Sequence, residues 1–89
     1  MDRIHLVLVC SDGSKWERMV SSVSLPGELG SLGILANHAP MLCALEEGIA
    51  GCRTEAGEKT RFRISKGIAN VANNEVTLLL SGMEQLPDK

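Results

Sequence analysis

Residues 60–81, TRFRISKGIANVANNEVTLLLS, carry the pattern that decides the fold. Apolar side chains take every second position near both ends of this stretch, at Phe62, Ile64, Val76, Leu78 and Leu80. A period of two is typical of a strand with one buried face. Between the apolar runs lies Asn73-Asn74, and asparagine tolerates the positive φ that a tight two-residue turn requires. The stretch therefore predicts antiparallel strands joined by short turns.

The same pattern extends towards the N-terminus. Residues 49–54 and 60–65 flank the four-residue connection Glu55–Glu58, which contains a glycine, and residues 41–45 form a short apolar run. Residues 3–10 alternate again, and glycine, proline and asparagine interrupt the chain at short intervals, which suits strands. We therefore predict an all-β fold, a flattened sandwich or barrel, as one domain over residues 1–89. From the residues alone we expect seven or eight strands. The expected buried positions are Ile4, Leu6, Leu8, Phe62, Ile64, Val76, Leu78 and Leu80.

Two segments are harder to assign. Residues 14–23 have apolar side chains at helical spacing and begin with a Ser14–Glu17 pair that resembles a capping box. The segment is short, however, and Ser21-Ser22 is a poor helix interior, so we predict an extended conformation. Leu25-Pro26-Gly27 and the glycines from Gly30 to Gly33 predict a glycine-rich connection that no helix crosses. No helix N-terminus follows to bind an anion, so we do not expect a phosphate loop.

Composition limits the function. The formal net charge is −2, and the chain has one Trp, one Phe and no Tyr, which argues against a nucleic-acid binder. No apolar run approaches the ~18–20 residues that cross a bilayer, and the N-terminus does not resemble a signal peptide. The three cysteines, Cys10, Cys43 and Cys52, show no Cys-x-x-Cys spacing. We interpret them as free, largely buried thiols in a reducing compartment.

His38 is the polar residue best able to act chemically, because Pro40 places it in or near a loop. One alternative makes the chain a small cysteine hydrolase that uses Cys43 with His38 as base. Cys43 lies in an apolar run, however, where burial raises the pKa of a thiol and lowers its reactivity. A metal site with His5 and Cys10 has no regular spacing to support it. We therefore expect no catalytic residue, cofactor or metal, and a role for His38 in a loop or interface.

Five segments in order carry a resemblance to a known family. They are LPG at 25–27, GSLGI at 30–34, NHAP at 37–40, SKGIANV at 65–71 and NNEVTLL at 73–79. Together they resemble the signature of the epsilon subunits of rotary ATP synthases, and the resemblance covers essentially the whole chain. It implies a ten-stranded β-sandwich that acts as a non-catalytic rotor part of the central stalk. Such a subunit couples the gamma shaft to the ring of c subunits during proton transport and ATP synthesis.

The resemblance also implies the partner contacts. Carried over by position, Cys10, His38 and Cys43 lie toward gamma, whereas Gly30, Ser31 and Leu32 face the polar loops of the c ring. Many family members have an acidic residue where this chain has Ser31, which weakens an expected ion pair. The subunit is then peripheral, on the cytoplasmic face of a bacterial plasma membrane, and meets the membrane only through the complex.

Two expectations remain open beside this assignment. Most epsilon subunits continue into a C-terminal helical hairpin, whereas this sequence stops after Leu86-Pro87-Asp88-Lys89. We expect a natural short form that exerts no ATP-sensitive inhibition. The alternative to a rotor subunit is a free-standing β-sandwich that binds another protein and shares only the fold.

Overall fold

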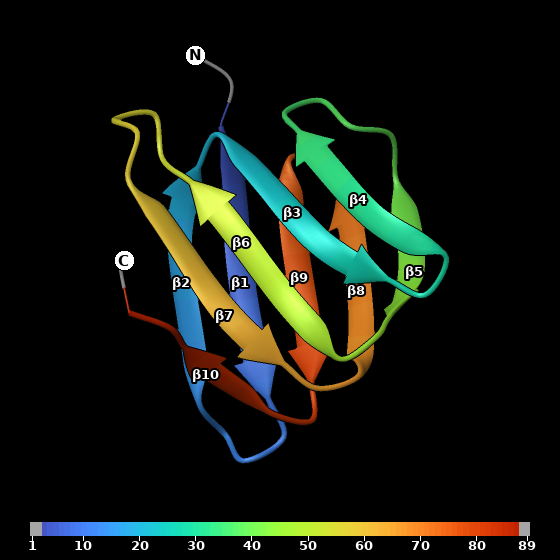
Figure 1. Cartoon of the computed structure of the whole chain (residues 1–89). Coiled ribbons are helices and arrows are strands. Elements are labelled where there is room, and N and C mark those ends of the chain that lie inside the picture. Colours follow the sequence, from blue (N-terminus) through green and yellow to red (C-terminus); the bar gives the residue numbers. More distant parts are fainter. Residues whose placement is uncertain (1–2, 88–89) are drawn as a thin grey trace.

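The computed structural model describes residues 3–87, and in this range the chain forms ten strands and no helix (Figure 1). The strands are β1 (Ile4–Cys10), β2 (Lys15–Val20), β3 (Ser22–Gly27), β4 (Gly30–Leu35), β5 (Met41–Leu45), β6 (Gly48–Arg53), β7 (Lys59–Ile64), β8 (Gly67–Ala72), β9 (Glu75–Leu80) and β10 (Met83–Gln85). The all-β prediction is confirmed, and the strand count is the ten that the resemblance implied. Within these residues there is no helix long and apolar enough to cross a membrane.

All ten strands belong to one sheet that curls over on itself. Its order is β10-β7-β6-β3-β5-β8-β9-β1-β2, with β4 paired to β3 outside this path. Figure 1 shows a back layer of β2, β1, β9, β8 and β5 behind a front layer of β4, β3, β6, β7 and β10. Neighbouring strands are antiparallel except β1 and β9, which pair in parallel and join the two ends of the chain.

The core lies between the two layers and is built from the inward positions of each strand. All eight residues predicted to be buried are at most 4% exposed, so that prediction is confirmed. At the open edge between the layers, Trp16 of β2 meets Phe62 of β7 edge to face, with ring centroids 4.8 Å apart. Beside them, Arg18 Nη1 of β2 lies 3.6 Å from Glu58 Oε1 in the β6–β7 turn. One aromatic pair and one exposed ion pair therefore close this edge.

The turns follow the predicted chemistry. Asn73 and Asn74 have φ values of 53° and 61°, which is the left-handed region that a tight hairpin turn needs. The β6–β7 connection uses Gly57 at φ 94°. Residues 14–23 are extended, as predicted, and the chain passes from β2 to β3 at Ser21. The backbone N–H and the hydroxyl of Ser21 both donate to the carbonyl oxygen of Arg53, at 2.7 and 3.0 Å.

The glycine-rich connection expected at Leu25-Pro26-Gly27 and Gly30 to Gly33 is wrong, because the first three residues end β3 and Gly30 to Gly33 are also strand. These residues begin β4, which forms a hairpin with β3 and places Ile34 in the core. Gly30 does need positive φ (129°), and a side chain at Gly27 would come within 2.7 Å of the Gly30 carbonyl oxygen. Gly33 has neither constraint, because its φ is not positive and a Cβ at this position would meet no atom within 4 Å. The short strand β10 was not predicted at all.

Candidate partner-binding surface

The loop that carries His38 is fixed against another turn. It spans residues 36–40 between β4 and β5, and Asn37 adopts a φ of 67°. The Asn37 N–H donates to Asn74 Oδ1 at 2.5 Å, and Asn74 Nδ2 donates to Asn37 Oδ1 at 3.2 Å. His38 is half-buried, and its Nδ1 lies 2.7 Å from the carbonyl oxygen of Ala39. A carbonyl only accepts, so Nδ1 is the donor in this contact.

The two cysteines expected near a partner face the interior instead. Cys10 shares the inward face of β1 with Leu8 and is 5% exposed. Cys43 of β5 packs against the core, and burial raises the pKa of its thiol. Within residues 3–87, the side chain of His38 makes one hydrogen bond, to Ala39 and not to Cys43. The Cys43 thiol therefore stays protonated at neutral pH without a base beside it, and the geometry gives no support to a cysteine hydrolase.

The six residues predicted to contact partners do not form one cluster. β1 and β9 run in parallel, with His5 opposite Glu75 and Cys10 opposite Leu80, so Cys10 lies at the far end of this pair from the Asn74 turn and the His38 loop. Gly30, Ser31 and Leu32 begin β4, at the opposite end of that strand from His38. Gly30 and Ser31 are exposed, whereas Leu32 packs partly against the core.

The tip of the β3–β4 hairpin presents a residue that the sequence reasoning missed. Leu29 occupies the turn and is fully exposed, at 101%. The turn end of this hairpin is held by the Glu28 N–H, which donates to the Ala44 carbonyl at 3.1 Å, and by the Glu46 N–H, which donates to the Pro26 carbonyl at 2.8 Å. A leucine held so far from the core on a fixed hairpin is well placed to contact a partner.

A second missed feature is an apolar row on the outer face of the back layer. Ala44, Ile68, Leu79 and Val9 lie directly opposite one another on β5, β8, β9 and β1. Leu42 lies on the same face of β5 and is 71% exposed, and Leu79 is 54% exposed. We call these five residues the apolar face. Single exposed leucines are ordinary, but a row continuous across four strands is typical of an interaction surface.

No metal centre accompanies these surfaces. Within residues 3–87 there is no group of three or more His, Cys, Asp and Glu side chains placed to hold an ion. The possible set of His5, Cys10 and His38 is not assembled, because His5 points outward from β1 and Cys10 points inward. The His5 ring instead lies between two carboxylates. Its Nε2 is 3.3 Å from Glu17 Oε2, and its Nδ1 is 3.5 Å from Glu75 Oε2.

Comparisons with known proteins agree with the fold and the motifs. Residues 3–85 match the family described as ATP synthase, Delta/Epsilon chain, beta-sandwich domain. The chain is 38% identical over 82 residues to the chloroplastic ATP synthase epsilon chain of Cyanidioschyzon merolae, covering 92% of this chain and 62% of that one. It is 41% identical over 78 residues to the ATP synthase epsilon chain of Thermosynechococcus vestitus, covering 88% and 56%. The chain thus spans little more than half the length of these relatives.

Solved structures give the same result. A chain in the cryo-EM structure of the Euglena gracilis mitochondrial ATP synthase, OSCP/F1/c-ring, superposes with a TM-score of 0.88 at 25% identity, covering 96% of this chain and 54% of that one. A chain of the Tetrahymena thermophila mitochondrial ATP synthase central stalk and c-ring superposes at 0.74 with 15% identity, covering 91% and 65%, which bears on the fold alone. The family match over residues 3–85 and these relatives show that the chain belongs to the family of ATP synthase delta/epsilon chain β-sandwich domains.

Proposed function

We propose that this chain is a non-catalytic rotor subunit in the central stalk of a proton-translocating ATP synthase, where it couples the gamma shaft to the c-subunit ring. The observation that carries the proposal is the family match over residues 3–85, together with relatives named ATP synthase epsilon chain. The apolar face and the exposed tip of the β3–β4 hairpin support a role in binding other proteins. A subunit of this kind works by binding two partners at once.

The apolar face is the proposed binding surface for gamma. Interfaces between stably associated proteins bury about 1,200–2,000 Å² around an apolar centre with a polar rim. Leu42, Ile68 and Leu79 supply such a centre. The loop with His38 leads into β5 next to Leu42, whereas its contact with Asn74 lies at the far end of β9 from Leu79. Cys10 and Cys43 lie behind this surface, so their proposed part is to support it from within.

The tip of the β3–β4 hairpin is the proposed contact with the c ring. Leu29, Gly30 and Ser31 are exposed there, and the turn end of the hairpin is anchored by backbone hydrogen bonds to β5 and to the residue after it. The similar Euglena gracilis chain comes from an assembly that includes a c-ring, which supports this partner. The membrane is then reached only through the complex. We place the subunit on the cytoplasmic face of a bacterial plasma membrane, although the Cyanidioschyzon merolae relative is chloroplastic.

Surface variants test the gamma contact. Leu79→Lys puts a charge in the middle of the apolar face, and we expect gamma binding to weaken at least tenfold, as at the centre of an interface. Leu35→Lys is the matched control, because Leu35 is 65% exposed on the opposite layer, and it should bind gamma normally. Affinity is measured by calorimetry with purified gamma. If the unaltered chain binds neither gamma nor the c ring, it is a free-standing module, and the proposal is wrong.

A further inference from the structure

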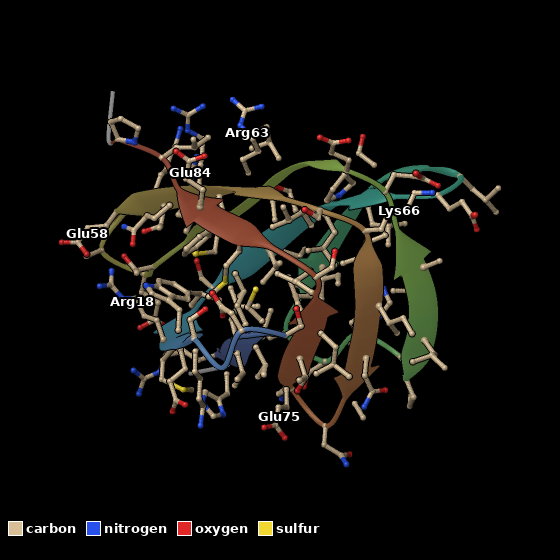
Figure 2. All side chains as sticks on the ribbon, turned by 90° about the horizontal axis from the view of Figure 1, so that it is seen from below. Arg18, Glu58, Arg63, Lys66, Glu75 and Glu84 are labelled. Atoms are coloured by element: carbon tan, nitrogen blue, oxygen red, sulfur yellow. The ribbon has the colours of Figure 1, made fainter. Side chains whose placement is uncertain are left out.

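The outer face of the front layer collects positive charge. Arg53 at the end of β6 and Lys59, Arg61 and Arg63 along β7 supply four of the nine Lys and Arg residues in a chain whose net charge is −2. All four are exposed, and within residues 3–87 none of them forms an ion pair. Figure 2 shows Arg63 pointing away from the core on one side of the molecule, with Glu75 on the opposite side. These cations therefore have no internal counterion.

Their arrangement is unfavourable for the chain alone. Arg53 and Lys59 are directly opposite each other in the β6–β7 register. Cross-strand neighbours on one face have Cβ atoms only about 4.5–5.5 Å apart, and like charges there destabilise the sheet. The nearest carboxylate in sequence, Glu58, pairs with Arg18 at the layer edge instead. Glu84 is the cross-strand neighbour of Arg63 but forms no ion pair with it. A bound anion would relieve this repulsion.

Beside these cations runs a groove of about 550 Å³. Its floor is Ser24 of β3, which lies opposite Gly33 of β4 on one side and Gly51 of β6 on the other. A Cβ at Gly33 would meet no atom within 4 Å. The floor is therefore open because two of its three residues lack side chains. The Arg53, Lys59 and Arg61 positions border this floor on one side.

The spacing of the cations indicates the shape of the ligand. Lys59, Arg61 and Arg63 alternate along one strand, so their Cα atoms repeat about every 6.6–6.8 Å. A single phosphate is best bound by donors that converge on one point, whereas these donors form a row. An extended peptide presents alternate side chains on one face with the same repeat. The cross-strand neighbour of Arg61 is Gly51 of β6, which has no side chain, so a backbone can lie beside the cation row there.

We propose that the cation row of β7, beside this groove, binds an extended protein segment with acidic side chains at alternate positions. Its carboxylates meet Lys59, Arg61 and Arg63, and its backbone runs along β7 beside Gly51, the cross-strand neighbour of Arg61. The site is separate from the apolar face, since the two occupy the outer faces of opposite layers (Figure 1). The subunit can therefore hold such a segment while bound to its rotor partners.

Two peptides of equal charge test the proposal on the full chain. One heptapeptide alternates Glu and Thr with Glu at both ends, and the other has four consecutive Glu followed by three Thr. We expect the alternating peptide to bind at least fivefold more tightly by calorimetry. Arg61→Gln should weaken it about tenfold, through loss of a charge-assisted hydrogen bond. Gly51→Val places a side chain next to Arg61 at a position without positive φ and should abolish the preference for the alternating peptide.

Lys66→Gln is the matched control, because Lys66 is an exposed lysine without an ion pair in the β7–β8 turn, outside the groove. It removes the same charge as Arg61→Gln and should leave binding unchanged. Equal affinity for the two peptides, equal weakening by Lys66→Gln and Arg61→Gln, displacement of the alternating peptide by equimolar inorganic phosphate, or no binding at all would each overturn the proposal. Because Arg61 is exposed, Arg61→Gln reports on binding even if Gly51→Val perturbs folding.

Discussion

Asn37 and Asn74 bind each other through two hydrogen bonds, one from the Asn37 backbone N–H and one from the Asn74 side chain, across 37 residues of sequence. Both asparagines have positive φ, so each shapes its own turn as well as making the contact. Asn74 also accepts a hydrogen bond at its carbonyl from the His5 N–H, at 2.9 Å. This one residue therefore ties the His38 loop to the β8–β9 turn and to the start of β1.

Replacing Asn74 with glycine isolates that contact. Glycine keeps the positive φ but removes both side-chain hydrogen bonds, so we expect a loss of about 1–2 kcal/mol in the free energy of unfolding. Amide exchange at Asn37 should become faster, because its N–H loses its acceptor. Asn73→Gly is the control, since Asn73 has the same turn geometry without the contact, and it should change neither quantity much. Urea unfolding and hydrogen exchange measure the two effects, and unaltered exchange at Asn37 would refute the coupling.

Two adjacent leucines separate core from surface. Leu78 is fully buried and Leu79 is 54% exposed. Leu78→Ala should cost about 2–5 kcal/mol of unfolding free energy, through lost burial and the cavity left behind. Leu79→Ala should change the unfolding free energy by no more than about 0.5 kcal/mol, as is usual for surface substitutions. Urea midpoints for the two variants check this, and comparable losses would mean that the assigned strand phase is wrong.

Much of this fold follows from alternation and turn chemistry. In the 60–81 stretch, the phase of Phe62 and Leu78 and the turn at Asn73-Asn74 were predictable because one buried face imposes a period of two. The helical spacing in residues 14–23 has a simple origin. Trp16 and Val20 point inward from β2 and Val23 points inward from β3 after the corner at Ser21, whereas Met19 points outward.

Other features depend on distant partners and could not be predicted. The three residues of β10 become a strand only because they pair with β7. In β4, the glycines at positions 30 and 33 made the sequence look like a connection, although Leu32 and Ile34 alternate inward as in a strand. For the site, the alternation that predicts the core already places Cys10 on its inward side. The apolar face could be predicted only with the strand register as well, because Leu79, Ile68 and Val9 come together only when β9, β8 and β1 pair.

The reactivity of Cys43 should depend on pH in a defined direction. Burial raises the pKa of its thiol, so at any given pH a smaller fraction is thiolate, which is the form that reacts. Iodoacetamide should therefore label Cys43 more slowly in the folded chain than in urea at pH 7. Its rate should still be rising at a pH where the unfolded thiol has reached its plateau. A Cys43→Ser variant identifies the labelled site. Faster labelling in the folded chain at pH 7 would mean an activated thiol and would revive the hydrolase interpretation.

Leu29 should decide the contact of the β3–β4 hairpin with the c ring. Its side chain is fully exposed, so Leu29→Ser should leave the unfolding free energy within about 0.5 kcal/mol of the original. The turn end of the hairpin stays anchored by the backbone hydrogen bonds of Glu28 and Glu46, so the tip keeps its position. In the proposed complex the ring covers the Leu29 side chain. Its loss should then weaken binding to detergent-solubilised c ring about tenfold, with gamma binding unchanged. Ser31→Ala removes only a hydroxyl from the same tip and should have a smaller effect. If Leu29→Ser binds the ring normally, another part of the subunit makes that contact.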